Sequence, residues 1–285
     1  MMNGISVVIC CYNSEQRLPK VLDHLNRQIL EDHIPWEVVV VDNASGDRTA
    51  EVARDLWKRT DAGMKVVSEP NPGLSHARMK GIAESSYDII SFIDDDNWVE
   101  SGWIQKVYHI MNNDPKIGIM GGHGEAVFES DPPEWFEKFQ SAYAVGSDGK
   151  TTGKQRDKRI KGAGMNMRRE SWEFLNSNGF EFLQSDRKGS ALSSGGDIEL
   201  CLAFLLAGFD LYYDDDLRFY HYMPAGRLTW EYLLKLYGAF GRADPIESMY
   251  VAFVNEKGFR LFISTNILIS TLRTLKDYVN FLPRR

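Results

Sequence analysis

Residues 88–97 have the sequence DIISFIDDDN, and this stretch decides the fold class. A short, mainly apolar run leads directly into three consecutive carboxylates, Asp94, Asp95 and Asp96. The run is typical of a buried strand. Adjacent carboxylates at a strand end repel one another and gain nothing from burial, whereas a bound divalent cation removes that penalty. Oxygen ligands suit Mg²⁺ or Mn²⁺, so the stretch predicts a metal site, with a solvated acidic turn as the alternative.

The preceding residues alternate between strand and helix patterns. Apolar runs at 6–10, 36–41, 65–67 and 88–93 predict strands, and helical spacing is found at 17–28, 49–57 and 74–83. Strands that are apolar throughout and separated by helices indicate a parallel sheet covered on both faces. Right-handed crossovers between such strands give a doubly wound α/β sheet.

Polar clusters follow each of these strands. The clusters are Tyr12-Asn13, Asp42-Asn43, Asn71-Pro72-Gly73 and Asp94-Asp95-Asp96. In open α/β sheets, ligands bind beyond the carboxyl ends of the strands. Four clusters on one edge therefore predict a binding site there.

The pattern changes after about residue 121. Residues 117–128 resemble strand material interrupted by glycines, 134–144 a short aromatic helix, and 146–161 a polar, mobile loop. A helix is expected at 197–206, strands at 211–213 and 218–220, and only helix from 229 onward, ending in an amphipathic helix at 259–282.

A second acidic triplet, Asp214-Asp215-Asp216, lies between the last two predicted strands. It has no matching polar clusters around it, so a solvated turn is expected there. Composition alone does not separate the two triplets, and context does.

The bulk composition excludes some classes of protein. The 285 residues carry a formal net charge of −7 and no basic stripe, which argues against a nucleic-acid partner. Neither a disulfide framework nor a signal peptide is expected, which favours a cytoplasmic protein. Charges break the apolar run of the last helix, so it is expected to lie peripherally on the inner face of the membrane or to pack on protein.

Five ordered segments carry a resemblance to a known family. They are residues 7–13, 39–49, 71–78, 92–97 and 195–200. With these the chain resembles an inverting GT-A glycosyltransferase of family 2, which includes bacterial polysaccharide transferases. The resemblance implies a Rossmann-like mixed α/β sheet with a C-terminal helical extension. It also implies a nucleotide-sugar-binding half at 1–120, an acceptor-binding and catalytic half of the same domain at 121–228, and the extension at 229–285.

The resemblance also implies donor-binding roles. Tyr12 would stack on the nucleobase and Asp42 would accept a hydrogen bond from it. Arg78 would reach the diphosphate, and Asp95 would face the ribose or the metal. The remaining implied contacts are Asn13, Asn71 and Arg227 for the donor and Asp96 and His221 for the metal. Each residue also has a plainer reading, as a surface tyrosine, a turn or capping residue, a surface ion pair or a structural histidine.

Asp197 is implied as the general base. Inverting transfer needs one carboxylate to take the acceptor hydroxyl proton, while a metal neutralises the leaving nucleoside diphosphate. Family members commonly carry Glu before this Asp, but here the residue is Gly196. Capping of the helix at 197–206 is the alternative role for Asp197.

The expected function is transfer of a hexosyl or N-acetylhexosaminyl group from a UDP-sugar to a glycan or lipid-linked glycan. Trp135, Phe136 and Tyr143 are candidates for an acceptor platform, although aromatic residues at helical spacing also suit a core. The main alternative is a non-catalytic nucleotide-sugar-binding or scaffold protein. A phosphatase and a nucleotidyltransferase fit less well, because Asn97 and Trp98 follow the triplet and no basic glycine-rich loop follows the first strand.

Overall fold

The computed structural model describes residues 2–31, 33–155, 159–184 and 195–254. Within these residues one nine-stranded sheet has the order β3-β2-β1-β4-β8-β6-β9-β5, and β7 pairs with β9. The strands are β1 (Met2–Cys11), β2 (Trp36–Asp42), β3 (Gly63–Ser68), β4 (Tyr87–Phe92), β5 (Asn97–Val99), β6 (Ile117–Phe128), β7 (Gly153–Gln155), β8 (Asn166–Arg168) and β9 (Asp210–Met223).

The sheet is mixed, as predicted. Strands β1 to β4 pair in parallel, and β6 pairs in parallel with β9. The short β8 is antiparallel to both β4 and β6, so it joins these two parallel groups and orients them alike. The six long strands therefore end on one edge of the sheet.

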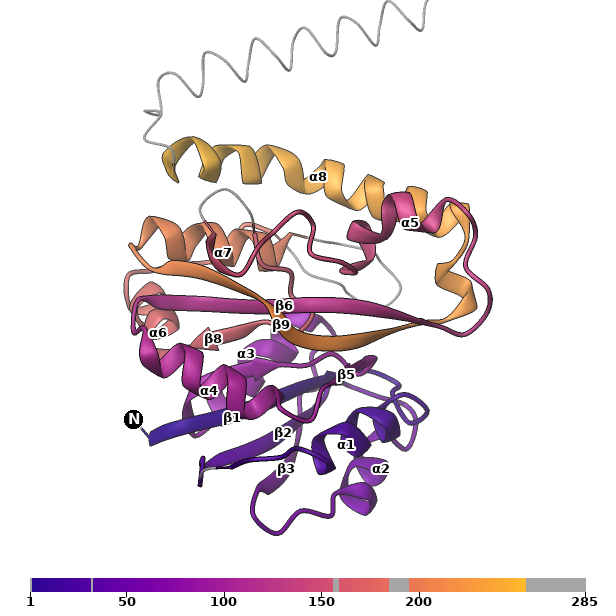
Figure 1. The fold of residues 1–285 in the computed structure, drawn as a ribbon, viewed down its shortest axis with the longest axis vertical. Helices are drawn as coiled ribbons and strands as arrows, with labels where there is room; N and C mark the ends of the chain where they lie inside the picture. The colour runs from indigo at the N-terminus through magenta and orange to yellow at the C-terminus, as the bar shows by residue number, and fades with distance from the viewer. Residues whose placement is uncertain (1, 32, 156–158, 185–194, 255–285) are drawn as a thin grey trace, which may run out of the picture.

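Helices cover both faces of the sheet (Figure 1). One core cluster joins it to α1 (Leu18–Asn26), α2 (Thr49–Leu56) and α4 (Trp103–Asn113). The other joins it to α3 (Leu74–Glu84), α6 (Arg169–Ser177) and α7 (Gly196–Leu206). Central strands with apolar residues on both sides are what this layering requires.

A third, smaller core lies beyond the carboxyl edge. It joins α5 (Phe136–Phe139), the 3₁₀ turn η1 (Gln140–Tyr143) and α8 (Trp230–Val254) to the end of β9. A second 3₁₀ turn, η2 (Ala225–Arg227), connects β9 to α8. In Figure 1, α8 lies along the top of the molecule above α7. These elements form a wall facing the sheet edge where the binding site was predicted.

Two predictions for the second half were wrong. Asp214, Asp215 and Asp216 lie inside the continuous strand β9 and do not form a turn between two strands. The pairing register with β6 shifts after Asp214, and this bulge accommodates the acidic residues. The Asp215 carboxylate then accepts a hydrogen bond from the Tyr213 hydroxyl at 3.0 Å, and the Asp215 amide donates one to the Thr152 hydroxyl oxygen at 3.0 Å. The predicted loop at 146–161 contains β7, which pairs with β9.

Other predictions were confirmed in type but not in extent. The helix expected at 134–144 is split into α5 and η1, and α8 begins the C-terminal helical part. The amphipathic helix at 259–282 lies outside the described residues. The predicted division at residue 120 falls inside β6, so the two proposed halves share one sheet and their separation stays a prediction.

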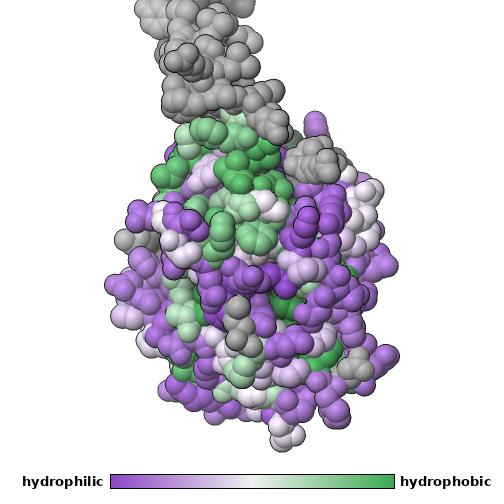
Figure 2. Space-filling view, turned by 90° about the vertical axis from the view of Figure 1, so that its left-hand side faces the viewer, coloured by the Kyte–Doolittle hydropathy of each residue, from purple (hydrophilic) through white to green (hydrophobic). Residues whose placement is uncertain are grey.

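The surface is uneven in hydropathy. In Figure 2, apolar side chains gather toward the upper end, next to the grey residues, and most of the remaining surface is hydrophilic. Helix α8 carries exposed Trp230, Leu234, Tyr237 and Phe253. Within the described residues, no helix combines the length and apolar character needed to span a bilayer.

Candidate active site

A cleft of about 660 Å³ lies at the carboxyl edge of the sheet, facing α8. Seven residues predicted for the site line it: Tyr12, Arg78, Asp95, Asp96, Asp197, His221 and Arg227. They come from the loops after β1 and β4, from strand β9 and from α3, α7 and η2. The structure thus brings together side chains that are up to 215 positions apart in the chain, the separation between Tyr12 and Arg227.

Asp96 is at the centre of a buried charged cluster. Its Oδ2 lies 2.9 Å from an Arg227 guanidinium nitrogen, and its Oδ1 lies 3.5 Å from His221 Nε2. Burial alone would raise the pKa of Asp96, but the charges of His221 and Arg227 hold that pKa well below its ordinary value. Asp96 therefore carries a full negative charge in the cleft.

The two neighbouring carboxylates have the opposite tendency. Burial and the nearby charge of Asp96 raise the pKa of Asp94 to about 6. The same two causes raise the pKa of Asp95, while Arg17 and Ser14 partly offset them. Burial and mutual repulsion therefore oppose simultaneous ionisation of all three carboxylates.

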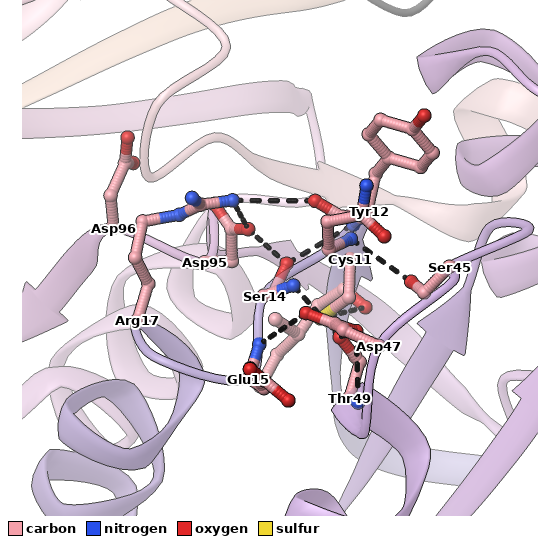
Figure 3. A network of polar contacts seen from close by, with 12 residues as sticks. Cys11, Tyr12, Ser14, Glu15, Arg17, Ser45, Asp47, Thr49, Asp95 and Asp96 are labelled. Atoms are coloured by element: carbon pink, nitrogen blue, oxygen red, sulfur yellow. Dashed lines mark hydrogen bonds and ion pairs between the residues drawn. The ribbon is translucent and has the colours of Figure 1, made fainter.

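Arg17 was not predicted for the site. Its guanidinium lies 2.7 Å from Asp95 Oδ2 and also donates to the Tyr12 carbonyl at 3.3 Å. The Ser14 hydroxyl donates to the same oxygen of Asp95. Figure 3 shows these contacts linking the loop after β1 to the triplet, with the Tyr12 ring pointing away from them. This leaves the ring, which is half exposed, available as a stacking surface.

Three residues predicted to contact the nucleotide-sugar donor have side chains that form hydrogen bonds with neighbouring loop residues. The Asn13 side chain accepts from the Gly46 amide at 2.8 Å, and Asn13 itself has a left-handed φ of 50°. Asp42 accepts from the Ser45 amide at 3.2 Å, and the Asn71 side chain donates to Glu69 at 2.9 Å. None of the three lines the cleft, and their proposed donor contacts stay predictions.

Asn43 holds the loop before α3 in place. This buried side chain donates to the carbonyls of Glu69 and Asn71, at 3.1 and 2.6 Å, and accepts from the Gly73 amide at 2.8 Å. Gly73 has a φ of 143°, which favours glycine. These three hydrogen bonds of Asn43 fix the start of α3, the helix that carries Arg78 into the cleft.

Asp197 lies on the first turn of α7 with both oxygens held by the backbone. Oδ2 accepts from the Gly162 amide at 2.7 Å, and Oδ1 accepts from the Ile198 amide at 3.0 Å. A methyl group on Gly162 would lie 2.7 Å from Arg78 and 3.3 Å from Asp197. Arg78 and Asp197 are therefore neighbours on the same side of Gly162. The N-cap residue of α7 is Gly195 and not Asp197.

The far wall of the cleft comes from η1 and α8. It includes Tyr143, Tyr232 and Tyr237 at one end and Asp244 and Glu247 toward Asp197. Burial and the Asp197 charge raise the pKa of Glu247. Phe136 and Tyr143 belong to the small core, and Trp135 packs against Trp230 at a ring distance of 5.5 Å. Of the three candidates for an acceptor platform, only Tyr143 lines the cleft.

Comparison with known families identifies the chain. The family model described as glycosyl transferase family 2 matches residues 6–174. The chain belongs to this family.

Similar proteins come from several bacteria. The glycosyltransferase EpsJ of Bacillus subtilis is 36% identical over 107 residues, which cover 38% of this chain and 30% of that protein. The poly-beta-1,6-N-acetyl-D-glucosamine synthase of Staphylococcus epidermidis is 28% identical over 43% of this chain and 29% of its own. The matched segments thus span less than a third of these relatives.

The fold is that of GT-A glycosyltransferases. A crystal structure of S. aureus TarS 1-349 in complex with UDP-GlcNAc aligns with a TM-score of 0.61 and 16% identity. The alignment covers 87% of this chain and 66% of the TarS chain. The α/β mixed sheet expected from the sequence is therefore confirmed as a GT-A sheet.

Proposed function

We propose that this protein is an inverting glycosyltransferase that moves a sugar from a UDP-sugar to a hydroxyl of a glycan or lipid-linked glycan during cell-surface polysaccharide synthesis. The observation that carries the proposal is the shared cleft: Asp197 and the acidic triplet line one cavity, and Arg78 lies next to both. A volume of about 660 Å³ is in the range of small-molecule sites. The polysaccharide synthase relative and the UDP-GlcNAc-bound TarS structure support the choice of substrates.

Asp197 is the proposed general base. Its carboxylate takes the proton of the acceptor hydroxyl as that oxygen attacks the anomeric carbon from the face opposite the diphosphate. The new carbon–oxygen bond forms as the bond to the diphosphate breaks, and the nucleoside diphosphate leaves with the bonding electrons. The two backbone amides on Asp197 support this role because they fix the orientation of the carboxylate.

The donor would be held by the other wall of the cleft. Tyr12 offers an aromatic face for the uracil ring, and Arg78 and Arg227 offer guanidinium groups for the diphosphate. Arg17 keeps the Tyr12 loop in position through Asp95. Asp42, Asn13 and Asn71 would complete the donor contacts from the neighbouring loops.

A divalent metal, Mg²⁺ or Mn²⁺, is part of the proposal, with Asp96 and His221 as its protein ligands. The fit rests on the buried Asp96 oxygen and His221 nitrogen, which lie 3.5 Å apart and can face one ion. Among the described residues no group of three or more His, Cys, Asp or Glu side chains is placed to hold a metal alone. Such an ion would take its remaining ligands from phosphate and water, as Mg²⁺ commonly does, and would neutralise the leaving diphosphate.

Substitution of the base tests the proposal. Asp197→Asn should retain UDP-sugar binding while the rate of transfer falls by about 10²–10⁴-fold, the usual contribution of a general base. UDP release and sugar transfer to a glycan acceptor measure the rate, and calorimetry measures binding.

Glu247→Gln is the matched comparison, because Glu247 lines the same cleft beside Asp197. This variant should keep most of the activity. The base assignment is wrong if Asp197→Asn turns over normally or if only Glu247→Gln is inactive. A wild-type protein that binds UDP-sugars but transfers none of them would favour the non-catalytic alternative.

A further inference from the structure

The carboxylate proposed as a metal ligand is already engaged by a cation. Asp96 Oδ2 lies 2.9 Å from Arg227, and the second terminal nitrogen of Arg227 lies 3.3 Å from His221 Nε2. The guanidinium thus contacts both of the side chains that would hold the metal. The Asp96 side chain is only 5% exposed, which leaves little room for a second cation on the same carboxylate.

The attachment of Arg227 favours movement of its side chain and not of its backbone. Its amide donates to the Pro224 carbonyl at 2.8 Å, and its carbonyl accepts from the Tyr143 hydroxyl at 3.1 Å. These bonds fix the η2 turn at the base of the residue. The guanidinium lies at the end of a long, flexible side chain and can leave Asp96 without disturbing the turn.

Electrostatic repulsion opposes binding of Asp96 by the Arg227 guanidinium and a divalent ion at the same time. A divalent ion on Asp96 and His221 would put two positive charges beside the Arg227 guanidinium, in a cleft where charges are poorly screened. Arg17, in contrast, pairs with Asp95, at 2.7 Å, and does not contact Asp96 Oδ2. The conflict therefore concerns Arg227 specifically.

We infer that Arg227 and the divalent metal compete for Asp96, and that metal binding transfers the Arg227 guanidinium from Asp96 to the donor diphosphate. The inference rests on the proposed metal site and goes beyond it, because it makes Arg227 the element that couples the two ligands. Metal binding alone has to break the Arg227–Asp96 pair, whereas metal and UDP together supply the displaced guanidinium with a new anionic partner. By linkage, each ligand then increases affinity for the other by the same factor.

Mn²⁺ binding tests the competition without any measurement of activity. Free Mn²⁺ is followed by electron paramagnetic resonance in the presence of the full chain, with and without saturating UDP. Arg227→Gln should bind Mn²⁺ alone more tightly than wild type, by about tenfold, and UDP should enhance its Mn²⁺ affinity much less than it does for wild type. Arg227→Lys keeps a charge but loses the forked contact, so it should fall between the two.

Arg17→Gln is the matched control, since it removes one positive charge from the same cleft but leaves the Asp96 contact in place. Its Mn²⁺ affinity should change less than that of Arg227→Gln, and UDP should still enhance it. Thermal unfolding of each variant establishes that it is folded, and Arg227→Lys provides the test if Arg227→Gln is not. Equal or weaker Mn²⁺ binding by folded Arg227 variants overturns the inference.

Failure of the proposed function gives a different result. If wild type binds no Mn²⁺ even with UDP, the metal site is wrong and the competition fails with it. If wild type shows the coupled binding but transfers no sugar, the competition stands and the catalytic proposal is refuted.

Discussion

Gly162 is the residue on which the relative position of Arg78 and Asp197 depends. Its amide donates to Asp197, and a methyl group in place of its α-hydrogen would come within 2.7 Å of Arg78. We expect Gly162→Ala to fold but to displace Arg78, Asp197 or both, and to lower kcat/KM for transfer by roughly 10²-fold, the usual cost of a misplacement of about 1 Å.

Gly102→Ala is a suitable control for this substitution. Nothing lies within 4 Å of the position that its methyl group would occupy, and its φ of −95° is ordinary for alanine. Both variants should unfold at temperatures close to that of wild type, as thermal denaturation would show. Unchanged kinetics in a well-folded Gly162→Ala would mean that the packing around this glycine is irrelevant to transfer.

At the scale of the element, α7 and α8 are joined by one buried carboxylate. Glu199, fully buried on α7, accepts from the amides of Leu183 and Gln184 at 2.9 and 3.0 Å and from the Tyr250 hydroxyl at 3.1 Å. Glu199→Gln places an amide nitrogen where an acceptor is needed and leaves a buried donor unsatisfied. We expect the free energy of unfolding to fall by about 2 kcal/mol in urea titrations with an unchanged m-value.

Tyr250→Phe removes only one of these three bonds. It should cost about 1 kcal/mol by the same measurement, because the Glu199 carboxylate keeps its two backbone donors. A loss for Tyr250→Phe as large as that for Glu199→Gln would show that α8, and not the 183–184 segment, depends on the carboxylate.

The elements that were predicted from the sequence are those with a local signal. The strands β1 to β4 and the helices α1 to α3 have apolar runs or helical spacing and were predicted close to their observed bounds, whereas the three-residue β5 was not predicted. Strand β8 was not predicted either, because it has only three residues, and two of them, Asn166 and Arg168, are buried polar residues. Its conformation follows from pairing with β4 and β6, which no local pattern reports. Arg17 was missed for the same reason: its partner Asp95 is 78 positions away.

The acidic strand segment in β9 is the converse case. Three adjacent carboxylates favour a turn when they are considered alone. The long pairing of β6 with β9 on both sides of the triplet overrides that preference, and the bulge absorbs the mismatch. This conflict does not arise for Asp94 to Asp96, because strand β4 ends at Phe92, before the triplet.

At the scale of the whole molecule, the single sheet determines how a ligand affects stability. The donor-side strands β1 to β4 and the strands β6 and β9 are joined through β8, so both groups should unfold together. Ligand that binds only the folded state then shifts one transition. At 100 times its Kd, UDP with Mn²⁺ should add about 2.7 kcal/mol of stability and raise Tm by about 5 °C or more.

The Asp96→Ala variant tests whether this shift in Tm depends on the proposed metal site. The variant lacks the carboxylate that Arg227 and the proposed metal share, so Mn²⁺ should no longer increase the stabilisation by UDP. Asp216→Asn, an exposed carboxylate of the other triplet, should respond as wild type does. Two separate transitions, only one of them moved by UDP, would instead show that the sheet does not couple its two halves, because a ligand stabilises only the cooperative unit that contains its site.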